Sequence, residues 1–247
     1  MHPAEATSKR RKLGQHYLVD DDVVQKIISA ADVTDSEVVL EIGTGKGVLT
    51  KVLAGSCQKL EGYDVDPTNV AVTRRSVTSG NVKVHQADAF KERPSFDVLV
   101  SSLPYSASAV FLDWLSQMTY DRAVVLLQED FVQKITATAG SRNYRAVSVI
   151  AQICSVITLG ERVGREAFSP PPRINSRIVT FRPKIRMQKR QIVLVKKLFS
   201  LRRRTLGSAC NTLGFCPPIH DNRMRRVYHL TPSEVYRIIS EVSALKA

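Results

Sequence analysis

Glycine and carboxylate residues recur where successive apolar runs of this chain end. The first run closes on Glu41-Ile42-Gly43-Thr44-Gly45-Lys46-Gly47, Asp64 follows the second run and Asp88 follows the third. Glycines after a strand let the chain turn tightly and let its backbone approach a ligand closely. Asp64 lies 21 residues after Gly43, near the spacing at which a carboxylate accepts both hydroxyls of a ribose. Asp88 could accept from an adenine amino group. Together these residues predict a site for a nucleotide-like ligand.

Two common fingerprints are excluded, and simpler roles stay open. The glycine run is not G-x-G-x-x-G, because Val48 holds the last position, and it is not a P-loop, because a glycine follows the lysine. The glycines could also form a purely structural turn. Asp66, directly before Pro67, and Asp88 could each cap a helix or turn instead of touching a ligand.

Short apolar runs alternate with helical periods from residue 37 onwards, which predicts strands separated by helices. Strands joined by such crossovers form a parallel, doubly wound α/β sheet, and ligands bind beyond the carboxyl ends of its strands. The residues named above all fall at those ends. The expected strands are 37–42, 60–65, 82–85, 96–100 and 122–127; the expected helices are one opening at 20–22, then 48–54, 68–77 and 107–118.

The rest of the chain predicts a sheet edge and a separate helical part. After a loop at 140–143 and a further helix, two strands around 155–163 and 176–181 are expected to complete the sheet with an antiparallel edge. Pro183 marks a boundary. Beyond it we expect a helix over 188–206 and another after Thr231-Pro232-Ser233-Glu234, which reads as a capping box. The predicted domains are a basic tail (1–12), a sheet domain (13–182) and a helical domain (183–247).

Basic side chains are concentrated in the last quarter of the chain. The formal net charge is +13, and residues 182–247 carry 15 basic and 3 acidic side chains, so this quarter holds +12 of it. A balanced body with a basic appendage is typical of a protein that docks on a polyanion, and nucleic acid is the leading partner. We predict that Lys196, Lys197, Arg203 and Arg204 face phosphate from one side of the helix 188–206, with a solvated basic face as the alternative.

The composition excludes other classes of protein. No apolar run approaches the roughly 18 to 20 residues of a spanning helix, and the first dozen residues are polar and basic, so we expect a soluble cytoplasmic protein without membrane contact. The basic run at 9–12 is compatible with a nuclear address, a nucleic-acid arm or a disordered tail. The cysteines, Cys57, Cys154, Cys210 and Cys216, lack the spacing of a zinc site and are too few for a disulfide scaffold, so reduced thiols and no metal site are expected.

Four motifs carry a resemblance to a known family. The spacing E-x-G-x-G-x-G at 41–47 is typical of S-adenosylmethionine-dependent methyltransferases, and Ser101-Ser102-Leu103-Pro104-Tyr105 resembles the (N/D/S)-P-P-Y element of methyltransferases acting on exocyclic amino groups, in its N-L-P-Y form. The other two are Leu13-Gly14-Gln15-His16-Tyr17-Leu18 and Phe168-x-Pro170-x-Pro172-x-Ile174-x-Ser176. From about Leu13 to Phe181 the chain resembles the KsgA-type ribosomal RNA adenine dimethyltransferases, relatives of the Erm antibiotic-resistance methyltransferases.

This resemblance implies a fold and an activity. The fold would be a Rossmann-like methyltransferase sheet at 13–182 with a small, basic, helical RNA-docking domain at 183–247. The activity would be transfer of methyl groups from S-adenosylmethionine to the exocyclic amino groups of two adjacent adenosines near the 3′ end of small-subunit ribosomal RNA. The partner would be a pre-ribosomal particle, and the protein a monomer.

The resemblance also assigns roles to single residues. An adenine amino group is a poor nucleophile because its lone pair is delocalised into the ring, so an enzyme must orient it and accept its protons as it becomes tetrahedral. The implied acceptors are the Ser102 side chain and the Leu103 carbonyl. Pro104 would fix the turn, and Tyr105 and Phe168 would stack on a flipped-out base, although either aromatic taken singly is more often a core residue.

The implied cofactor contacts lie on the strand ends and on the segment before the sheet. They are Gln15, near the methionine end of the cofactor, and His16, Leu18, Glu41, Gly43, Gly45, Gly47, Asp64, Val65, Asp88, Ala89 and Ser102.

Ser102 departs from the family, which has asparagine at this position. A serine hydroxyl can accept a hydrogen bond but reaches less far. Three functions therefore stay open: the small-subunit dimethyltransferase, another RNA methyltransferase of the same fold such as an Erm-like enzyme, and a non-enzymatic ribosome-assembly or transcription factor. Cofactor binding separates the third from the others, and the position of the modified nucleotide separates the first two.

Overall fold

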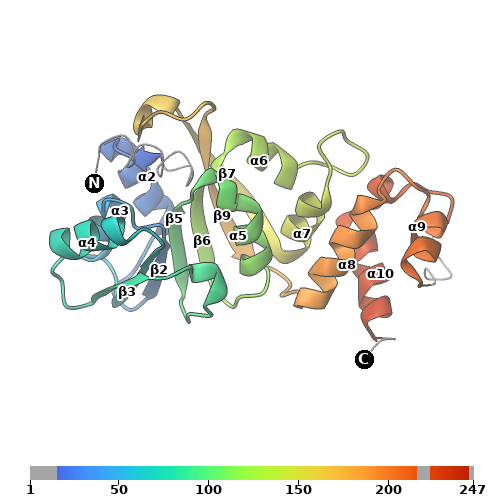
Figure 1. Cartoon of the computed structure of the whole chain (residues 1–247), viewed down its shortest axis with the longest axis horizontal. Helices are drawn as coiled ribbons and strands as arrows, with labels where there is room; N and C mark the ends of the chain where they lie inside the picture. The colour runs from blue at the N-terminus through green and yellow to red at the C-terminus, as the bar shows by residue number, and fades with distance from the viewer. Residues whose placement is uncertain (1–15, 216–222, 245–247) are drawn as a thin grey trace. The chain divides into compact units, whose positions relative to one another are not determined.

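A computed structural model of the chain describes residues 16–215 and 223–244, which gather in two compact units (Figure 1). The first unit takes in the described residues of Met1–Phe111, Thr119–Glu129 and Thr158–Pro183. The second takes in those of Leu112–Met118, Asp130–Ile157 and Lys184–Ala247. The units therefore interleave along the sequence and do not follow a single division at Pro183.

Seven strands form one sheet in the order β4-β3-β2-β5-β6-β9-β7. The neighbouring strands from β4 to β6 pair in parallel, and β9 pairs antiparallel with β6. The chain thus builds the sheet outwards from β2 in one direction and then returns to continue it in the other, which confirms the predicted doubly wound sheet with an antiparallel edge. The strands are β2 (Val38–Ile42), β3 (Lys59–Asp64), β4 (Val82–Gln86), β5 (Val98–Ser102), β6 (Arg122–Gln128), β7 (Ser155–Val163) and β9 (Ser176–Pro183).

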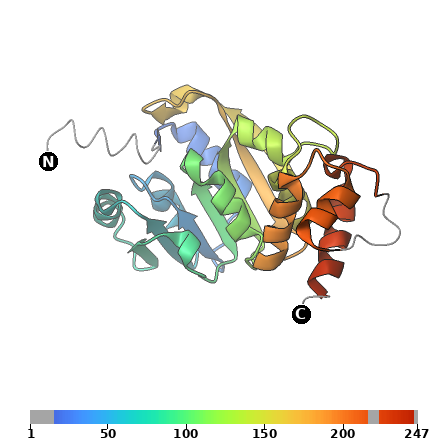
Figure 2. The same ribbon diagram turned by 45° about the vertical axis from the view of Figure 1, so that its right-hand side comes forward.

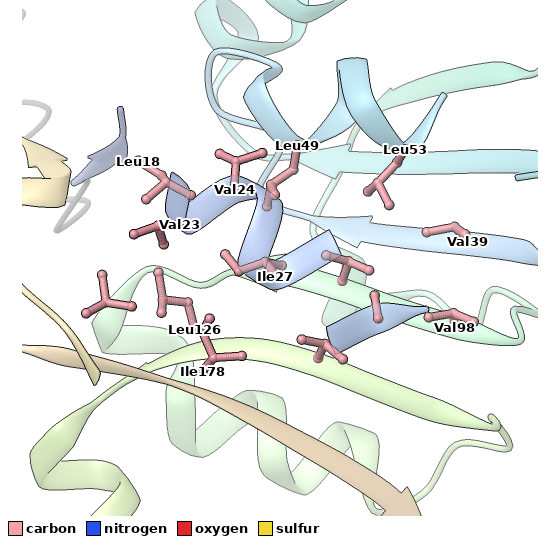
Figure 3. Close-up of a cluster of buried hydrophobic side chains, with 14 of the residues drawn as sticks. Leu18, Val23, Val24, Ile27, Val39, Leu49, Leu53, Val98, Leu126 and Ile178 are labelled. Carbon is pink, nitrogen blue, oxygen red and sulfur yellow. The ribbon is translucent and has the colours of Figure 1, made fainter. Parts of the chain in front are cut away.

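Helix α2 (Asp21–Ala31) covers one face of this sheet (Figure 3). It begins after Asp20, whose side chain accepts a hydrogen bond from the Val23 backbone at 3.1 Å, and acidic residues fill its first turn, where the helix dipole favours them. Its apolar side joins a buried cluster with side chains of α3 (Val48–Leu53) and of the central strands. The cluster includes Val23, Val24, Ile27, Leu49, Leu53, Val39, Val98, Leu126 and Ile178.

The opposite face of the sheet is also buried. Successive strand side chains point to opposite faces, so Leu40 and Leu99, which are fully buried, lie opposite Val39 and Val98. Phe111 of α5 (Ser108–Leu115) meets Phe181 of β9 edge to face, with ring centroids 6.0 Å apart. Helices on both faces explain why the strands read as continuous apolar runs, and Figure 2 shows these layers from a second direction.

Helix α4 (Pro67–Ser76) follows β3. The Asp66 side chain caps it by accepting from the Thr68 backbone at 2.9 Å, and Pro67 occupies the first helical position, where its missing N–H costs no hydrogen bond. The capping interpretation of Asp66 is confirmed.

Five helices lie wholly or mainly in the second unit. Helix α10 contacts both α7 and α8, and its predicted capping box is confirmed: the Thr231 backbone donates to Glu234 at 2.7 Å, and the Glu234 backbone donates to the Thr231 hydroxyl at 3.3 Å. The buried Tyr144 hydroxyl donates to the Leu230 carbonyl at 2.9 Å. The helices are α6 (Glu129–Ile135), α7 (Ala146–Cys154), α8 (Lys189–Ser200), α9 (Leu206–Leu213) and α10 (Pro232–Ala244).

The predicted helix 188–206 was wrong beyond Ser200. Helix α8 ends there because residues 202–204 make backbone hydrogen bonds to a distant segment: the Arg202 carbonyl accepts from Tyr228 and the Arg204 carbonyl from Val227, each at 3.1 Å. Thr205 then caps α9. Helix α6 was missed. The strand predicted at 96–100 lies two residues later in the structure, where β5 spans Val98–Ser102.

Three smaller findings complete the fold. The two-residue strands β1 (Tyr17–Leu18) and β8 (Phe168–Ser169) pair antiparallel, although about 150 residues separate them. Cys57, Cys154 and Cys210 are buried and are not joined by disulfides within the described part of the chain, and Cys216 lies outside it. Among the described residues, no helix combines the length and apolar character needed to cross a membrane.

Candidate functional site

A cavity of about 290 Å³ lies at the carboxyl ends of the parallel strands, near the lower limit for small-molecule sites. It brings together residues from β1, from the glycine turn and from the ends of β3, β4 and β5. Twelve predicted site residues line it: His16, Leu18, Glu41, Gly43, Gly45, Asp64, Val65, Asp88, Ala89, Ser102, Leu103 and Pro104. Gly47, Tyr105 and Phe168 are not among its lining residues, and Gln15 lies outside the described part of the chain.

The glycine turn requires backbone angles that other residues rarely adopt. Gly43, Gly45 and Gly47 have φ angles of +79°, +53° and +78°. The Gly43 backbone donates to the Tyr63 carbonyl at 2.7 Å, which ties the turn to β3. Gly47 stands at the start of α3, and a Cβ there would lie 3.0 Å from the Ser76 hydroxyl of α4. Its role in the structure is therefore close packing of two helix ends.

Asp64, the predicted ribose ligand, is already well hydrogen-bonded. One carboxylate oxygen accepts from the Gly45 backbone at 3.0 Å and from Asn69 at 3.1 Å, and the other accepts from the Asp66 backbone at 2.8 Å. A carboxylate offers about four acceptor positions, so roughly one remains. Burial raises the pKa of this carboxyl, and the donated hydrogen bonds oppose that rise. Asp64 thus organises the glycine turn as well as facing the cavity.

Glu41 lies under the same turn. Its side chain is 1% exposed and accepts from the Thr50 hydroxyl of α3 at 2.7 Å. Burial raises the pKa of Glu41 to about 8; the hydrogen bond from Thr50 opposes that rise, and the nearby Asp64 charge adds to it.

Asp88 caps a short helix and also lines the cavity. Its side chain accepts from the Phe90 backbone at 3.1 Å and so caps the short 3₁₀ helix Ala89–Lys91. The same residue lines the cavity at the end of β4.

The Ser102-Leu103-Pro104-Tyr105 segment leaves β5 directly beside the glycine turn. A Cβ on Gly43 would lie 3.8 Å from both the Ser102 carbonyl and the Pro104 ring. Within residues 16–215 and 223–244, no protein group hydrogen-bonds the Ser102 hydroxyl or donates to the Leu103 carbonyl. Pro104 adopts an extended conformation, with φ −55° and ψ 131°, before the 3₁₀ turn Tyr105–Ala107.

The two predicted base-stacking residues differ in their surroundings. Tyr105 stacks on His16, with ring centroids 5.3 Å apart, and its hydroxyl hydrogen-bonds Ser176 at 2.9 Å. Phe168 is 4% exposed, belongs to the buried cluster and meets the Tyr105 ring edge to face at 6.5 Å. As the structure stands, the Phe168 ring is a core side chain with almost no surface to offer a base.

The β1–β8 pair brings the first and last motifs together. Tyr17 pairs with Ser169, Leu18 pairs with Phe168, and His16 Nδ1 lies 2.7 Å from the Pro170 carbonyl oxygen. Two motifs that lie far apart in the sequence thus meet, and the second motif holds the β1 residues that line the cavity.

The sequence did not predict the buried polar residues of α4 that hydrogen-bond to Asp64 and to the glycine turn. Asn69 and Thr73 are buried on one side of α4, four residues apart. Asn69 donates to Asp64, and the Thr73 hydroxyl donates to the Gly45 carbonyl at 3.2 Å. Their spacing on one helix face was the only available signal, because buried polar residues do not stand out in a hydrophobic pattern.

The predicted RNA-contacting residues do not share one helix face. Lys196 forms an ion pair with Asp113, whereas Arg203 and Arg204 lie in the turn after α8. Arg204 donates to the Thr212 hydroxyl at 3.1 Å, and the Lys197 carbonyl accepts from Ser200 at 2.7 Å.

More arginines gather near this turn than the sequence indicated. Burial, followed by the charges of Arg202, Arg203 and Arg142, lowers the pKa of the Arg145 guanidinium. Arginines of the loop before α7 and of the turn after α8 therefore lie close enough for their charges to interact.

Comparisons with known proteins agree with this geometry. The family model described as ribosomal RNA adenine dimethylase matches residues 6–218. A probable ribosomal RNA small subunit methyltransferase A from Pyrococcus abyssi is 35% identical over 240 residues, covering 92% of this chain and 89% of that protein. A ribosomal RNA small subunit methyltransferase A from Coxiella burnetii is 32% identical over 251 residues, covering 93% and 96% respectively.

Solved structures share the fold. A dimethyladenosine transferase from Plasmodium falciparum superposes with a TM-score of 0.79 at 24% identity, covering 93% of this chain and 98% of that one. The 23S rRNA methyltransferase ErmE superposes with a TM-score of 0.65 at 22% identity, covering 92% and 99%. The Rossmann-like methyltransferase sheet with C-terminal helices is therefore confirmed. With the family model matched over most of its length and relatives above 30% identity along more than nine-tenths of it, the chain belongs to the ribosomal RNA adenine dimethylase family, whose members are S-adenosylmethionine-dependent methyltransferases.

Proposed function

We propose that this protein transfers methyl groups from S-adenosylmethionine to the exocyclic amino groups of two adjacent adenosines near the 3′ end of small-subunit ribosomal RNA. The substrate is supported by the relatives of Pyrococcus abyssi and Coxiella burnetii, both of which are small-subunit methyltransferases by name. We further propose that the protein acts as a monomer, in the cytoplasm, on a pre-ribosomal particle.

One observation carries the proposal: a single cavity holds carboxylates suited to an adenosine together with acceptors suited to an amine. Asp64 and Asp88 both line it, as do Ser102 and Leu103. This set of acceptors therefore fits S-adenosylmethionine, whose ribose hydroxyls and adenine amino group need acceptors. When bound, the cofactor supplies an electrophilic methyl group on a positively charged sulfur.

The residues of the fourth strand end have the chemistry that an amine substrate needs. The adenine amino group must present its lone pair while its two protons are held by acceptors. The Ser102 hydroxyl and the Leu103 carbonyl make no hydrogen bond to other described protein groups, so both are available for this. Because β5 is a buried strand and Pro104 restrains the backbone after it, both acceptors are held in place before the substrate arrives.

Tyr105 is the better supported of the two proposed stacking residues. Its hydroxyl is held by Ser176 and its ring is held by His16, so the aromatic plane is fixed beside the proposed acceptors. We assign Phe168 to positioning the Tyr105 ring from behind, since it is buried and meets that ring edge to face.

The test is methyl transfer to small-subunit particles that lack the modification. Particles are incubated with the protein and with S-adenosylmethionine that carries a labelled methyl group, and the RNA is then read by primer extension. We expect extension to stop at two adjacent adenosines near the 3′ end, because a dimethylated amino group can no longer pair with the primer strand. Omitting the cofactor should remove both stops.

Two controls separate the alternatives. Large-subunit particles treated in parallel should gain no label, and label found only there would identify an Erm-like enzyme. Calorimetric titration with the cofactor alone checks the site independently of RNA. Absence of both cofactor binding and transfer would reject an enzymatic function and leave the ribosome-assembly or transcription factor.

A further inference from the structure

A buried asparagine joins three segments that meet at the cavity. Asn69 of α4 is 6% exposed and lines the cavity wall. Its amide nitrogen donates to an Asp64 oxygen at 3.1 Å, and its amide oxygen accepts from the Tyr17 hydroxyl of β1 at 3.1 Å. An asparagine offers a donor and an acceptor on one short side chain, so it can hold a carboxylate and a hydroxyl at the same time.

Tyr17 also lies against the glycine turn. A Cβ on Gly45 would be 3.3 Å from the Tyr17 ring, and the Lys46 ammonium lies over that ring, 5.2 Å from its centre. The Gly45 backbone in turn donates to the same Asp64 oxygen that Asn69 holds. The contacts therefore close a circuit from Tyr17 through Asn69 and Asp64 to Gly45 and back to Tyr17.

We propose that Asn69 is a positioning residue that couples the ribose-binding carboxylate of Asp64 to strand β1. Cofactor binding then stabilises β1 in its position packed against the glycine turn, which we call the seated position, and a seated β1 in turn strengthens cofactor binding. The proposal rests on the proposed function, since it takes Asp64 as the cofactor's ribose ligand. By linkage, the factor by which a seated β1 tightens cofactor binding equals the factor by which cofactor favours the seated strand.

Comparison with leucine and aspartate, which have a similar size, shows why position 69 needs an amide. Leucine would fill a similar volume but would remove the acceptor that holds the Tyr17 hydroxyl and a donor that holds one Asp64 oxygen. Aspartate would keep an acceptor for Tyr17 but would place a second carboxylate beside Asp64. Only an amide satisfies both neighbours without adding charge.

The test compares Asn69→Leu, Tyr17→Phe and the double variant with wild type. Cofactor affinity is measured by calorimetry, and the seating of β1 by amide hydrogen exchange of the segment that includes Val19, whose backbone donates to the Ala167 carbonyl at 2.9 Å. We expect Asn69→Leu to weaken cofactor binding about tenfold and Tyr17→Phe about threefold, in line with buried hydrogen bonds to charged and neutral groups. The double variant should be no weaker than Asn69→Leu alone, because both changes break one chain of contacts.

Two readouts separate coupling from a merely structural role. In wild type, cofactor should slow amide exchange in β1, and this protection should be lost in Asn69→Leu. In steady-state methyl transfer, KM for the cofactor should rise while kcat stays close to wild type, since RNA-side contacts are unaltered.

Asn81→Leu is the matched control. Asn81 also has its side-chain amide in hydrogen bonds, at 3.0 Å to the carbonyls of Ala54 and Cys57, but it does not line the cavity. Its loss should lower thermal stability without changing cofactor affinity or the protection of β1.

Wild-type affinity and wild-type β1 protection in Asn69→Leu would overturn the proposal. So would strictly additive losses in the double variant, which would mean that Tyr17 and Asn69 act separately. If Asn69→Leu does not fold, Tyr17→Phe still decides the matter, because it removes one hydroxyl and keeps the ring. Failure of wild type to bind cofactor would instead reject the proposed function, so the two outcomes are distinguishable.

Discussion

At the scale of single residues, the proposed chemistry depends most on Ser102. The hydroxyl lies at the end of β5, in the cavity, where the family pattern has the longer asparagine. If it accepts one proton of the target amine while the Leu103 carbonyl accepts the other, Ser102→Ala should lower the rate of methyl transfer by about tenfold to a thousandfold. Cofactor affinity should hardly change, because the contact matters chiefly in the transition state. Single-turnover transfer to small-subunit particles, with calorimetry in parallel, measures both.

Ser102→Asn is the informative companion to this variant. It restores the longer acceptor of the family, and we expect it to retain or raise activity where the cavity accommodates the added atoms. Equal rates for wild type and Ser102→Ala would mean that the Leu103 carbonyl acts alone. No transfer by wild type, with a gain in Ser102→Asn, would favour a binding protein over an enzyme.

At the scale of elements, Arg122 fixes the end of α2 to the start of the interior strand β6. From the first position of β6 it donates to the Ala31 and Asp32 carbonyls, each at 2.5 Å, and to both carboxylate oxygens of Glu37, at 2.7 and 2.9 Å. The helix carbonyls left without partners at its C-terminus are thus satisfied by a side chain distant in sequence. The Arg122 guanidinium lowers the pKa of Glu37 to about 2.

Removing this arginine should destabilise the fold and change its response to acid. We expect Arg122→Met to lower the free energy of unfolding by about 2 to 4 kcal/mol at neutral pH, because it leaves the half-buried Glu37 carboxylate with only the Thr34 backbone as donor and removes the donor to the Ala31 and Asp32 carbonyls. The folded pKa of Glu37 lies below its ordinary value of 4.5, so its contribution is present above that value and is lost as the pH falls towards 2. Urea unfolding at several pH values should show a shallower loss between pH 5 and 2 in the variant.

Glu37→Gln provides the control for that prediction. It removes the titrating group and should show the same shallow pH dependence, but it keeps the hydrogen bonds to Ala31 and Asp32 and should lose less stability at neutral pH. A wild-type acid profile in Arg122→Met would show that Glu37 does not titrate with the fold.

At the scale of the whole molecule, the basic charge is segregated from the candidate site. The last quarter carries most of the net charge, whereas the cavity is built from residues before it. We therefore expect that reversing Arg203 and Arg204 together to Glu weakens RNA binding and flattens its dependence on log salt by about 0.7 to 0.9 for each phosphate that the protein no longer neutralises. Cofactor affinity should be unchanged. Filter binding across a salt series, with calorimetry for the cofactor, measures the two effects.

The charge-matched control reverses Lys51 and Lys83, which are exposed on the first unit outside this quarter. It should alter the salt slope less than the arginine pair. Lys196→Ala should also have a smaller effect than replacement of Arg203, because Asp113 already neutralises Lys196. An unchanged slope in the arginine variant would identify those charges as a solvated face.

The sequence by itself determined the sheet, its connections and the strand ends that carry the site. Continuous apolar runs separated by helical periods leave few topologies, because crossovers between parallel strands have one hand and ligands collect at the carboxyl edge. The order of the residues alone therefore places Asp64, Asp88, the glycine turn and the Ser102 segment at one edge of the sheet. The capping roles of Asp66 and Thr231 were readable for a related reason: they depend only on neighbours within a few residues.

Only the tertiary structure decided which distant segments meet. The β1–β8 pair, the circuit from Tyr17 through Asn69 to Asp64, and the arginines gathered around Arg145 all join residues whose separation in sequence carries no local signal. The tertiary structure also decided where α8 ends, since residues 202–204 leave the helix and form backbone hydrogen bonds with Val227 and Tyr228. Local periodicity records how a segment buries its own apolar side, whereas buried polar partners and helix ends are fixed by whichever group the rest of the chain brings within hydrogen-bond reach.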